Sequence, residues 1–104
     1  MSTFDNVSIN RAANIYFDGK VTSRTITFAN GEVKTLGIML PGEYTFNTDK
    51  KELMEIQAGK VEVQLAGSDK WKAYSGGESF EVPAQSSFNI KIKTIADYCC
   101  SFLD

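Results

Sequence analysis

Short runs of alternating apolar and polar residues follow one another along most of the chain, and glycine-containing turns separate them. The clearest run is residues 61–65, Val-Glu-Val-Gln-Leu, which places apolar side chains on one face of a strand and polar side chains on the other. An Asn-Gly pair at residues 30–31 lies between two such runs and is a strong hairpin signal. The one candidate helix, residues 50–57, also fits a strand. The sequence therefore predicts an all-β protein, a jelly roll or a small barrel.

The chain has 104 residues, which is enough for one hydrophobic core but not for two. We expect a single domain in which residues 1–14 form an N-terminal arm or edge strand and residues 15–104 form the barrel. The net charge of −2 gives no basic surface of the kind that binds nucleic acid or an anionic membrane. No apolar run has the length of a transmembrane helix, and the first residues lack a signal-peptide pattern, so we expect a cytoplasmic protein.

Histidine is absent from the chain, and its absence excludes several kinds of site. It removes Ser-His-Asp and Cys-His catalysis, and it removes the histidine-rich sites typical of iron, copper, nickel and catalytic zinc. Cys99 and Cys100 are adjacent, and neighbouring side chains in a strand point to opposite faces. We therefore expect two reduced thiols with packing roles, and no metal site.

Two acidic residues, Glu43 and Glu55, interrupt apolar surroundings on neighbouring predicted strands. A barrel interior would desolvate their carboxyl groups and suit them to general acid or base chemistry. The alternative, which the sequence leaves open, is that each faces solvent at a rim. Glu52 follows two lysines and is expected at the surface on local grounds.

Cations and aromatic rings are the other candidate ligand-binding groups. Lys20, Arg24 and Lys34 lie on the first two long predicted strands, where one of them could hold an anion, although a solvated strand face is the commoner fate. The aromatic residues are numerous for a short chain, and most of them must form the core. A flat ligand would still find stacking partners among them.

The bends of residues 42–88 resemble the two signature segments of the cupin superfamily. Glycines and Glu52 fall roughly in place for the first segment, and Gly77 and Pro83 match the second. Phe88 occupies the histidine position of that second segment, where it would project into the cupin cavity. The pattern is therefore cupin-like in its turns but lacks the metal-binding histidines. Glu52 is the one possible metal ligand that remains.

Residues 14–21, 34–46 and 77–83 closely resemble the pyrimidine/purine nucleoside phosphorylase family of small bacterial cupins, and residues 97–102 are similar too. The resemblance implies an all-β, cupin-like jelly-roll barrel that forms a homodimer. It implies a pentosyltransferase of nucleoside salvage with broad specificity. Such an enzyme would convert purine and pyrimidine nucleosides and phosphate to a free base and a pentose 1-phosphate. No cofactor is expected, and inorganic phosphate would be the co-substrate.

The reaction needs stabilisation of a cationic sugar and a held phosphate, but neither a metal nor a histidine. Glycosidic cleavage passes through an oxocarbenium-like state, as in glycoside hydrolysis. We predict that Glu43 or Glu55 binds the sugar hydroxyls and favours this cation. We predict that Lys20 or Lys34 contacts the phosphate.

The base pocket is predicted from aromatic residues, since an aromatic ring stacks on any base and would suit broad specificity. Its expected residues are Tyr44, Phe46 and Phe88. A different class of function is a non-catalytic cupin that binds a small metabolite. A metal-dependent cupin oxygenase or isomerase is disfavoured by the missing histidines.

Overall fold

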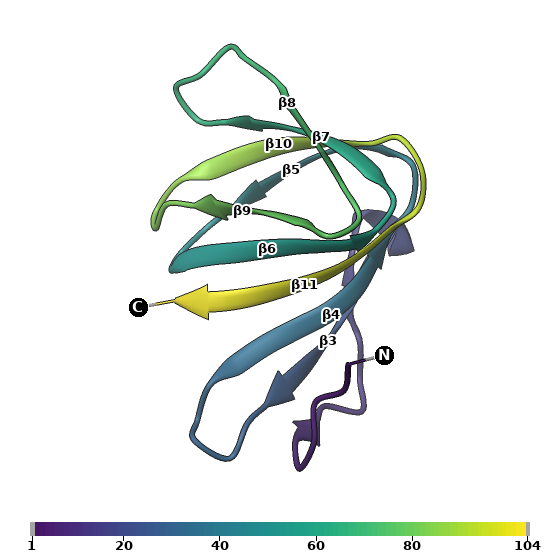
Figure 1. Cartoon of the computed structure of the whole chain (residues 1–104), viewed down its shortest axis with the longest axis vertical. Helices are drawn as coiled ribbons and strands as arrows, with labels where there is room; N and C mark the ends of the chain where they lie inside the picture. Colours follow the sequence, from purple (N-terminus) through teal and green to yellow (C-terminus); the bar gives the residue numbers. More distant parts are fainter. Residues whose placement is uncertain (1, 104) are drawn as a thin grey trace.

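The computed structural model describes residues 2–103, and nearly all of their regular structure is strand (Figure 1). The helical part of this range is one 3-10 turn, η1 (Phe17–Gly19). No helix among residues 2–103 has the length and apolar character that crossing a bilayer would demand. Of the candidate helix at residues 50–57, residues 51–57 lie in strand β6 (Lys51–Ala58). The all-β prediction is therefore confirmed.

Two antiparallel sheets form the domain. The seven-stranded sheet contains, in spatial order, β1 (Ser8–Ile9), β3 (Val21–Thr27), β4 (Val33–Met39), β11 (Ala96–Leu103), β6 (Lys51–Ala58) and β9 (Glu78–Val82), and β2 (Asn14–Tyr16) also pairs with β3. The four-stranded sheet contains β5 (Gly42–Asn47), β10 (Ser87–Ile92), β7 (Lys60–Leu65) and β8 (Lys72–Ser75). The last strand of the chain, β11, thus lies between β4 and β6 in the middle of the larger sheet.

The first strands of the chain form the edge of the larger sheet. Strand β1 and the start of β2 fall within residues 1–14, and both strands pair with β3. The division of the chain at residue 14 into an arm and a barrel stays a prediction. Met1 and Asp104, the outer limits of those two ranges, lie outside the described residues.

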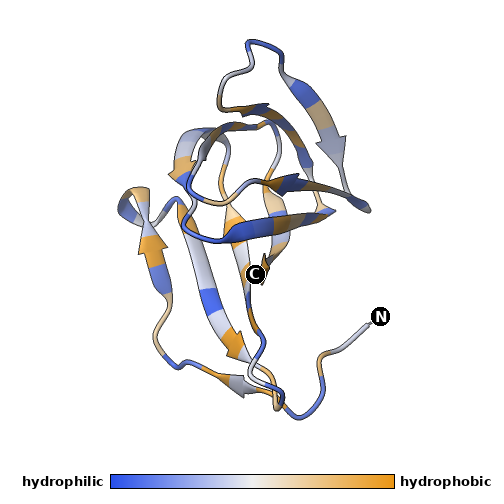
Figure 2. Ribbon diagram, turned by 90° about the vertical axis from the view of Figure 1, so that its left-hand side faces the viewer, coloured by the Kyte–Doolittle hydropathy of each residue, from blue (hydrophilic) through white to orange (hydrophobic). Residues whose placement is uncertain are grey.

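Alternation along the strands decides which side chains point between the sheets, and Figure 2 shows hydrophobic and hydrophilic residues following each other along the ribbons. The aliphatic core lies where β6 and β9 face β7 and β10. Its members Ile56, Val61, Val82 and Ile90 are at most 1% exposed. Each buried side chain of this kind stabilises the fold by about 1.5–3 kcal/mol.

A β-bulge interrupts the pairing of β6 with β11. Asp97 is opposite Ala58 but Tyr98 is opposite Ile56, so Gln57 is an extra residue on β6. The side-chain amide of Gln57 donates a hydrogen bond of 3.0 Å to Asp97. From this point along β11, the inward residues are Tyr98 and Cys100.

Candidate active site

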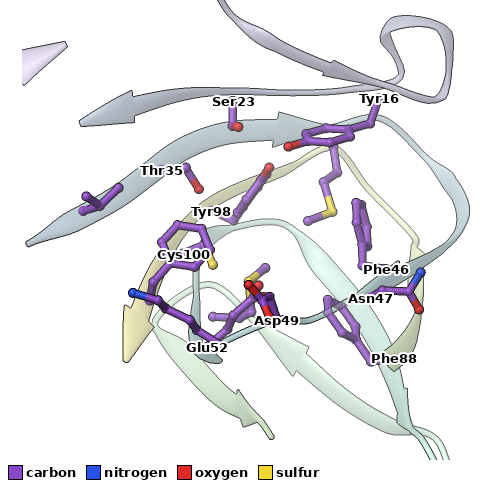
Figure 3. A pocket seen from close by; sticks show the side chains of 15 residues that line it. Tyr16, Ser23, Thr35, Phe46, Asn47, Asp49, Glu52, Phe88, Tyr98 and Cys100 are labelled. Carbon is purple, nitrogen blue, oxygen red and sulfur yellow. The ribbon is translucent and has the colours of Figure 1, made fainter. Parts of the chain in front are cut away.

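A cavity of about 550 Å³ opens between the inner face of the larger sheet and β5 (Figure 3). Its lining comes mainly from β4, β11, β5 and β6, and β2, β3 and β10 contribute one residue each. This volume is typical of a small-molecule site. The cavity therefore brings together residues from both ends of the sequence.

Aromatic rings form one wall of the cavity. Phe46 on β5 and Phe88 on β10 are cross-strand partners, and their rings stack with centroids 5.6 Å apart and planes at 28°. Tyr16 meets Phe46 edge-on at 6.2 Å. Figure 3 shows Phe46 and Phe88 on the same side of the cavity. The wall thus presents flat apolar surface to a ligand.

Glu52 is the acidic group that burial affects most at this site. It is half-buried in the cavity lining beside Met54 on the same strand. Burial raises the pKa of the Glu52 carboxyl, and a hydrogen bond with the Cys100 side chain opposes this effect. Burial and the neighbouring Glu52 charge in turn raise the pKa of the Cys100 thiol. At this position Glu52 is suited to hold a proton, whereas Cys100 is a poor nucleophile.

Hydroxyl groups gather on the wall opposite Glu52, as Figure 3 shows for Ser23, Thr35, Tyr16 and Tyr98. The Tyr98 hydroxyl is hydrogen-bonded to Ser23, and burial raises its pKa. The Tyr98 ring can cross β4 because its partner there is Gly37. A Cβ atom on Gly37 would lie 2.8 Å from the Tyr98 ring. The glycine therefore lets one tyrosine span three strands.

The mouth of the cavity is formed by the loop between β5 and β6. Asn47, Asp49 and Lys50 contribute to the lining there, and all three are exposed. Lys50 is the only cation in the lining among residues 2–103. Within the same range, no three His, Cys, Asp or Glu side chains come together as metal ligands would.

The profile of the pyrimidine/purine nucleoside phosphorylases matches residues 11–102. The chain belongs to this family. A relative of that name from Geotalea daltonii is 66% identical over 103 residues, which are 99% of each chain. Another, from Hydrogenovibrio crunogenus, is 59% identical over 104 residues and is covered completely, as is this chain. The family resemblance predicted from the sequence is thus confirmed.

Solved structures agree on the fold. A protein of unknown function from Acinetobacter sp. ADP1 superposes with a TM-score of 0.94 at 38% identity, covering 97% of this chain and 98% of that one. An RmlC-like cupin from Shewanella frigidimarina superposes with a TM-score of 0.70 at 16% identity, covering 97% and 86%. The second likeness concerns the fold alone. Together they confirm the cupin-like architecture.

The aromatic residues predicted for the base pocket lie together, although not all of them line the cavity. Phe46 and Phe88 are in its wall. Tyr44 is buried beside Phe46, with ring centroids 6.4 Å apart, and its hydroxyl donates a 2.7 Å hydrogen bond to the Leu40 carbonyl. Tyr44 therefore supports the aromatic wall without lining the cavity.

The two acids selected from the sequence lie on outer faces of the family fold. Glu43 is exposed on β5 opposite Lys91. Glu55 is on β6 opposite Cys99, and alternation turns it away from the cavity. Neither lines the cavity, and Glu52, which was expected at the surface, does. The sequence did contain a signal for the position of Glu52, because alternation places it on the same strand face as the apolar Met54 and Ile56.

The two lysines selected from the sequence are also outside the cavity lining. Lys20 is exposed just after η1. Lys34 points outward from β4, and its Nζ lies 5.5 Å and 5.7 Å from the ring centroids of Phe4 and Phe28. Roles for Lys20, Lys34, Glu43 and Glu55 stay predictions.

Proposed function

We propose that this chain is a pyrimidine/purine nucleoside phosphorylase, an enzyme that transfers the pentose of a nucleoside to phosphate. The observation that carries the proposal is the full-length match to relatives of that name. The products are a free base and a pentose 1-phosphate. We further propose a cytoplasmic pentosyltransferase of nucleoside salvage that uses inorganic phosphate and no cofactor.

The aromatic wall supports binding of the nucleobase. Stacking on a ring is worth about 1–3 kcal/mol per base and tolerates every base, because each base has a π-face. Phe46 and Phe88 present such rings to the cavity. A site that holds purines and pyrimidines by stacking accounts for broad specificity without separate hydrogen-bond patterns.

Glu52 is proposed as the general acid. In the reaction, a phosphate oxygen bonds to C1′ of the pentose while the bond from C1′ to the base nitrogen breaks. The base leaves with that electron pair and takes a proton from the Glu52 carboxyl, and the proton of hydrogen phosphate then restores Glu52. The raised pKa of Glu52 supports this role, because a general acid must carry its proton near working pH.

Lys50 is proposed to contact phosphate at the mouth of the cavity. It is the only described lining residue that carries a positive charge. An ammonium group there would offset the repulsion between phosphate and the carboxylate of Asp49, which also lies at the mouth. The bound phosphate would then approach the sugar from the solvent side.

The test is phosphate-dependent release of free base from a panel of nucleosides. Glu52→Gln should lower turnover by about a hundredfold or more, because the amide keeps the shape but supplies no proton. Glu43→Gln and Glu55→Gln are the matched controls and should keep near-normal turnover. A 4-nitrophenyl riboside, whose phenolate leaves without a proton, should be cleaved almost equally by the Glu52→Gln and parent proteins.

Three results would contradict these assignments. Binding of nucleosides without any release of base would favour the alternative, a non-catalytic cupin that binds a small metabolite. Full turnover of Glu52→Gln together with a loss of turnover in Glu43→Gln or Glu55→Gln would mean that Glu43 or Glu55, and not Glu52, is the catalytic acid. An equal loss on the nitrophenyl riboside would assign Glu52 to sugar stabilisation instead of proton transfer.

Chelators should leave activity unchanged, and elemental analysis checks for bound metal.

A further inference from the structure

A second cavity, of about 220 Å³, lies beside β8, the edge strand of the four-stranded sheet, and far from β3 in Figure 1. Its lining comes from β7, β8, β9 and the loop of residues 66–71 between β7 and β8. It shares no lining residue with the active-site cavity. Most ligand pockets measure about 300–1,000 Å³, so this smaller cavity suits a molecule of about one ring.

Aromatic and aliphatic side chains form most of the lining of this second cavity. Phe80 on β9 is only 7% exposed, and its ring centroid lies 4.9 Å from that of Tyr74 on β8, with the planes at 33°. Val63 and Leu65 on β7 point to the same side, because they are two residues apart. Leu65 is nevertheless 37% exposed. The cavity thus offers apolar surface that a flat ring would cover.

The charged part of the lining is positive. Lys70 and Lys72 both contribute, and no acidic residue among residues 2–103 does. Asp69, which lies between them in the chain, is outside the lining, and neither lysine forms an ion pair within the described part of the chain. Lys72 Nζ instead lies 5.5 Å from the centroid of the Tyr74 ring. The charge therefore lies directly beside the apolar surface, with no carboxylate in the lining to repel an anion.

The hydroxyl group of Ser68 supplies a further hydrogen-bond donor. Its Oγ accepts a 3.2 Å hydrogen bond from the backbone N–H of Lys70, and the Ser68 backbone N–H donates a 3.1 Å hydrogen bond to the Leu65 carbonyl. These two bonds hold the loop against the end of β7. Because Ser68 Oγ accepts a bond from Lys70, its own proton can be donated to a ligand oxygen. Two ammonium groups and one hydroxyl suit the lone pairs of a carboxylate.

We propose that this cavity is a second binding site, which takes a small aromatic carboxylate. The ring would pack against Tyr74 and Phe80, and the carboxylate would be held by the two lysines and the Ser68 hydroxyl. One layer of rings separates the site from the active-site cavity, since Phe80 meets Phe88 edge-on at 6.0 Å and Phe88 lines that cavity. The inference does not depend on the proposed function, because no residue assigned to the reaction lines the second cavity.

Benzoate is the probe, and chemical-shift changes of the backbone amides in isotope-labelled protein locate its binding. Benzoate should shift the amides of residues 63–74 saturably, with a Kd on the order of 1 mM for so small a ligand. Benzyl alcohol keeps the ring without the charge, and acetate keeps the charge without the ring. Each should bind about tenfold more weakly than benzoate. Added salt should weaken benzoate binding, because both lysines are exposed.

Variants that remove charge test the two lysines. Lys70→Gln and Lys72→Gln should each weaken benzoate binding about two- to fivefold, and the double variant K70Q/K72Q about tenfold, since each change removes one exposed ion pair with the ligand. The matched control is Lys60→Gln, which is exposed at the start of β7 and outside both linings, and its Kd should equal that of the parent. The amide spectrum shows whether each variant is folded, and the comparison of the three probes needs only the parent protein.

Four results would overturn the proposal. The absence of any shift at residues 63–74 up to the solubility limit of benzoate shows that the cavity does not bind it. Shifts confined to the surroundings of Phe46 and Phe88 show that benzoate binds in the active-site cavity instead. Equal binding of benzoate and benzyl alcohol, or equal binding of benzoate by the parent and K70Q/K72Q, shows that the lysines do not select an anion. An equal weakening in Lys60→Gln shows an effect of overall charge and not of this site.

Discussion

The space between the two sheets is filled where β9 and the end of β6 face β7 and β10, and hollow where β3, β4, β11 and the start of β6 face β5. On the filled side the inward positions hold aliphatic residues such as Ile56, Val63 and Ile90. On the hollow side they hold a hydroxyl, a carboxyl or a thiol, as in Ser23, Glu52 and Cys100. The same two-residue alternation produces both sides, so the type of inward residue makes the difference.

The comparison shows that one side of the space between the sheets mainly stabilises the domain and the other side holds the polar groups that could do chemistry. Aliphatic side chains pack without leaving polar atoms to satisfy, whereas a carboxyl or hydroxyl group must keep a partner or remain near a cavity. The hollow side keeps such groups, and a raised carboxyl pKa is one consequence. We therefore expect substitutions on the two sides to have different kinds of effect.

The largest effect on stability is expected on the filled side. Ile56 is 1% exposed, and Ile56→Ala should lower the free energy of unfolding by about 2–5 kcal/mol, because it removes buried methyl groups and leaves a void. Urea unfolding measures this. Thr35→Ala, at an inward position that lines the cavity, is the matched change on the hollow side and should cost much less. Equal losses in the two variants would remove the distinction between the sides.

A substitution at Gly37 tests whether the hollow side is loosely packed. Gly37→Ala places a methyl group against the Thr22 carbonyl and the Tyr98 ring. Both the backbone of β3 and the ring must shift, at a cost of about 1–3 kcal/mol. Thermal unfolding should therefore detect the variant, and the Tyr98–Ser23 hydrogen bond should weaken. An unchanged melting temperature would mean that β3 and the Tyr98 ring both adjust without cost, and would contradict tight packing at Gly37.

A smaller effect, on substrate affinity, is expected from the aromatic wall. Phe46→Ala should raise KM for every nucleoside by about tenfold, because it removes one stacking surface worth about 1–3 kcal/mol per base. Phe28→Ala, whose ring packs on Phe4 on the outer face, is the control and should leave KM unchanged. If Phe46→Ala affects purines but not pyrimidines, the two classes of base bind differently.

The smallest effect is a pH-dependent gain in stability in Glu52→Gln. The folded pKa of Glu52 is raised above the ordinary value of 4.5, so the folded protein holds this proton after the unfolded chain has released it. The stability of the parent protein therefore falls as pH rises from 4.5 through the folded pKa. The variant lacks this loss and should melt higher than the parent at neutral pH. The difference should vanish near pH 4, and a constant difference would contradict the burial of Glu52.

Local patterns in the sequence predicted the strands but not the arrangement of the cavity. The alternating run at residues 61–65 lies in β7, and the Asn30-Gly31 pair joins β3 to β4. Alternation gave Glu52 and Met54 a common face, yet it did not say which face points inward. That choice depends on pairing between distant strands. The insertion of β11 between β4 and β6 brings Tyr98 to Ser23, and no local signal in the sequence indicates this neighbourhood.

The bulge at Gln57 sets the register of β6 against β11, and so decides which of its side chains point inward. Because one extra residue is accommodated there, Ile56, Met54 and Glu52 come opposite Tyr98, Cys100 and Phe102. Without it, a one-residue slip would exchange the two faces of the strand and carry Leu53 and Glu55 inward. The identity of the acid in the cavity therefore depends on the pairing of a residue that is not part of the cavity lining. Regular pairing that placed Gln57 opposite Tyr98 would turn Leu53 and Glu55 toward the cavity without any change in the composition of the strand.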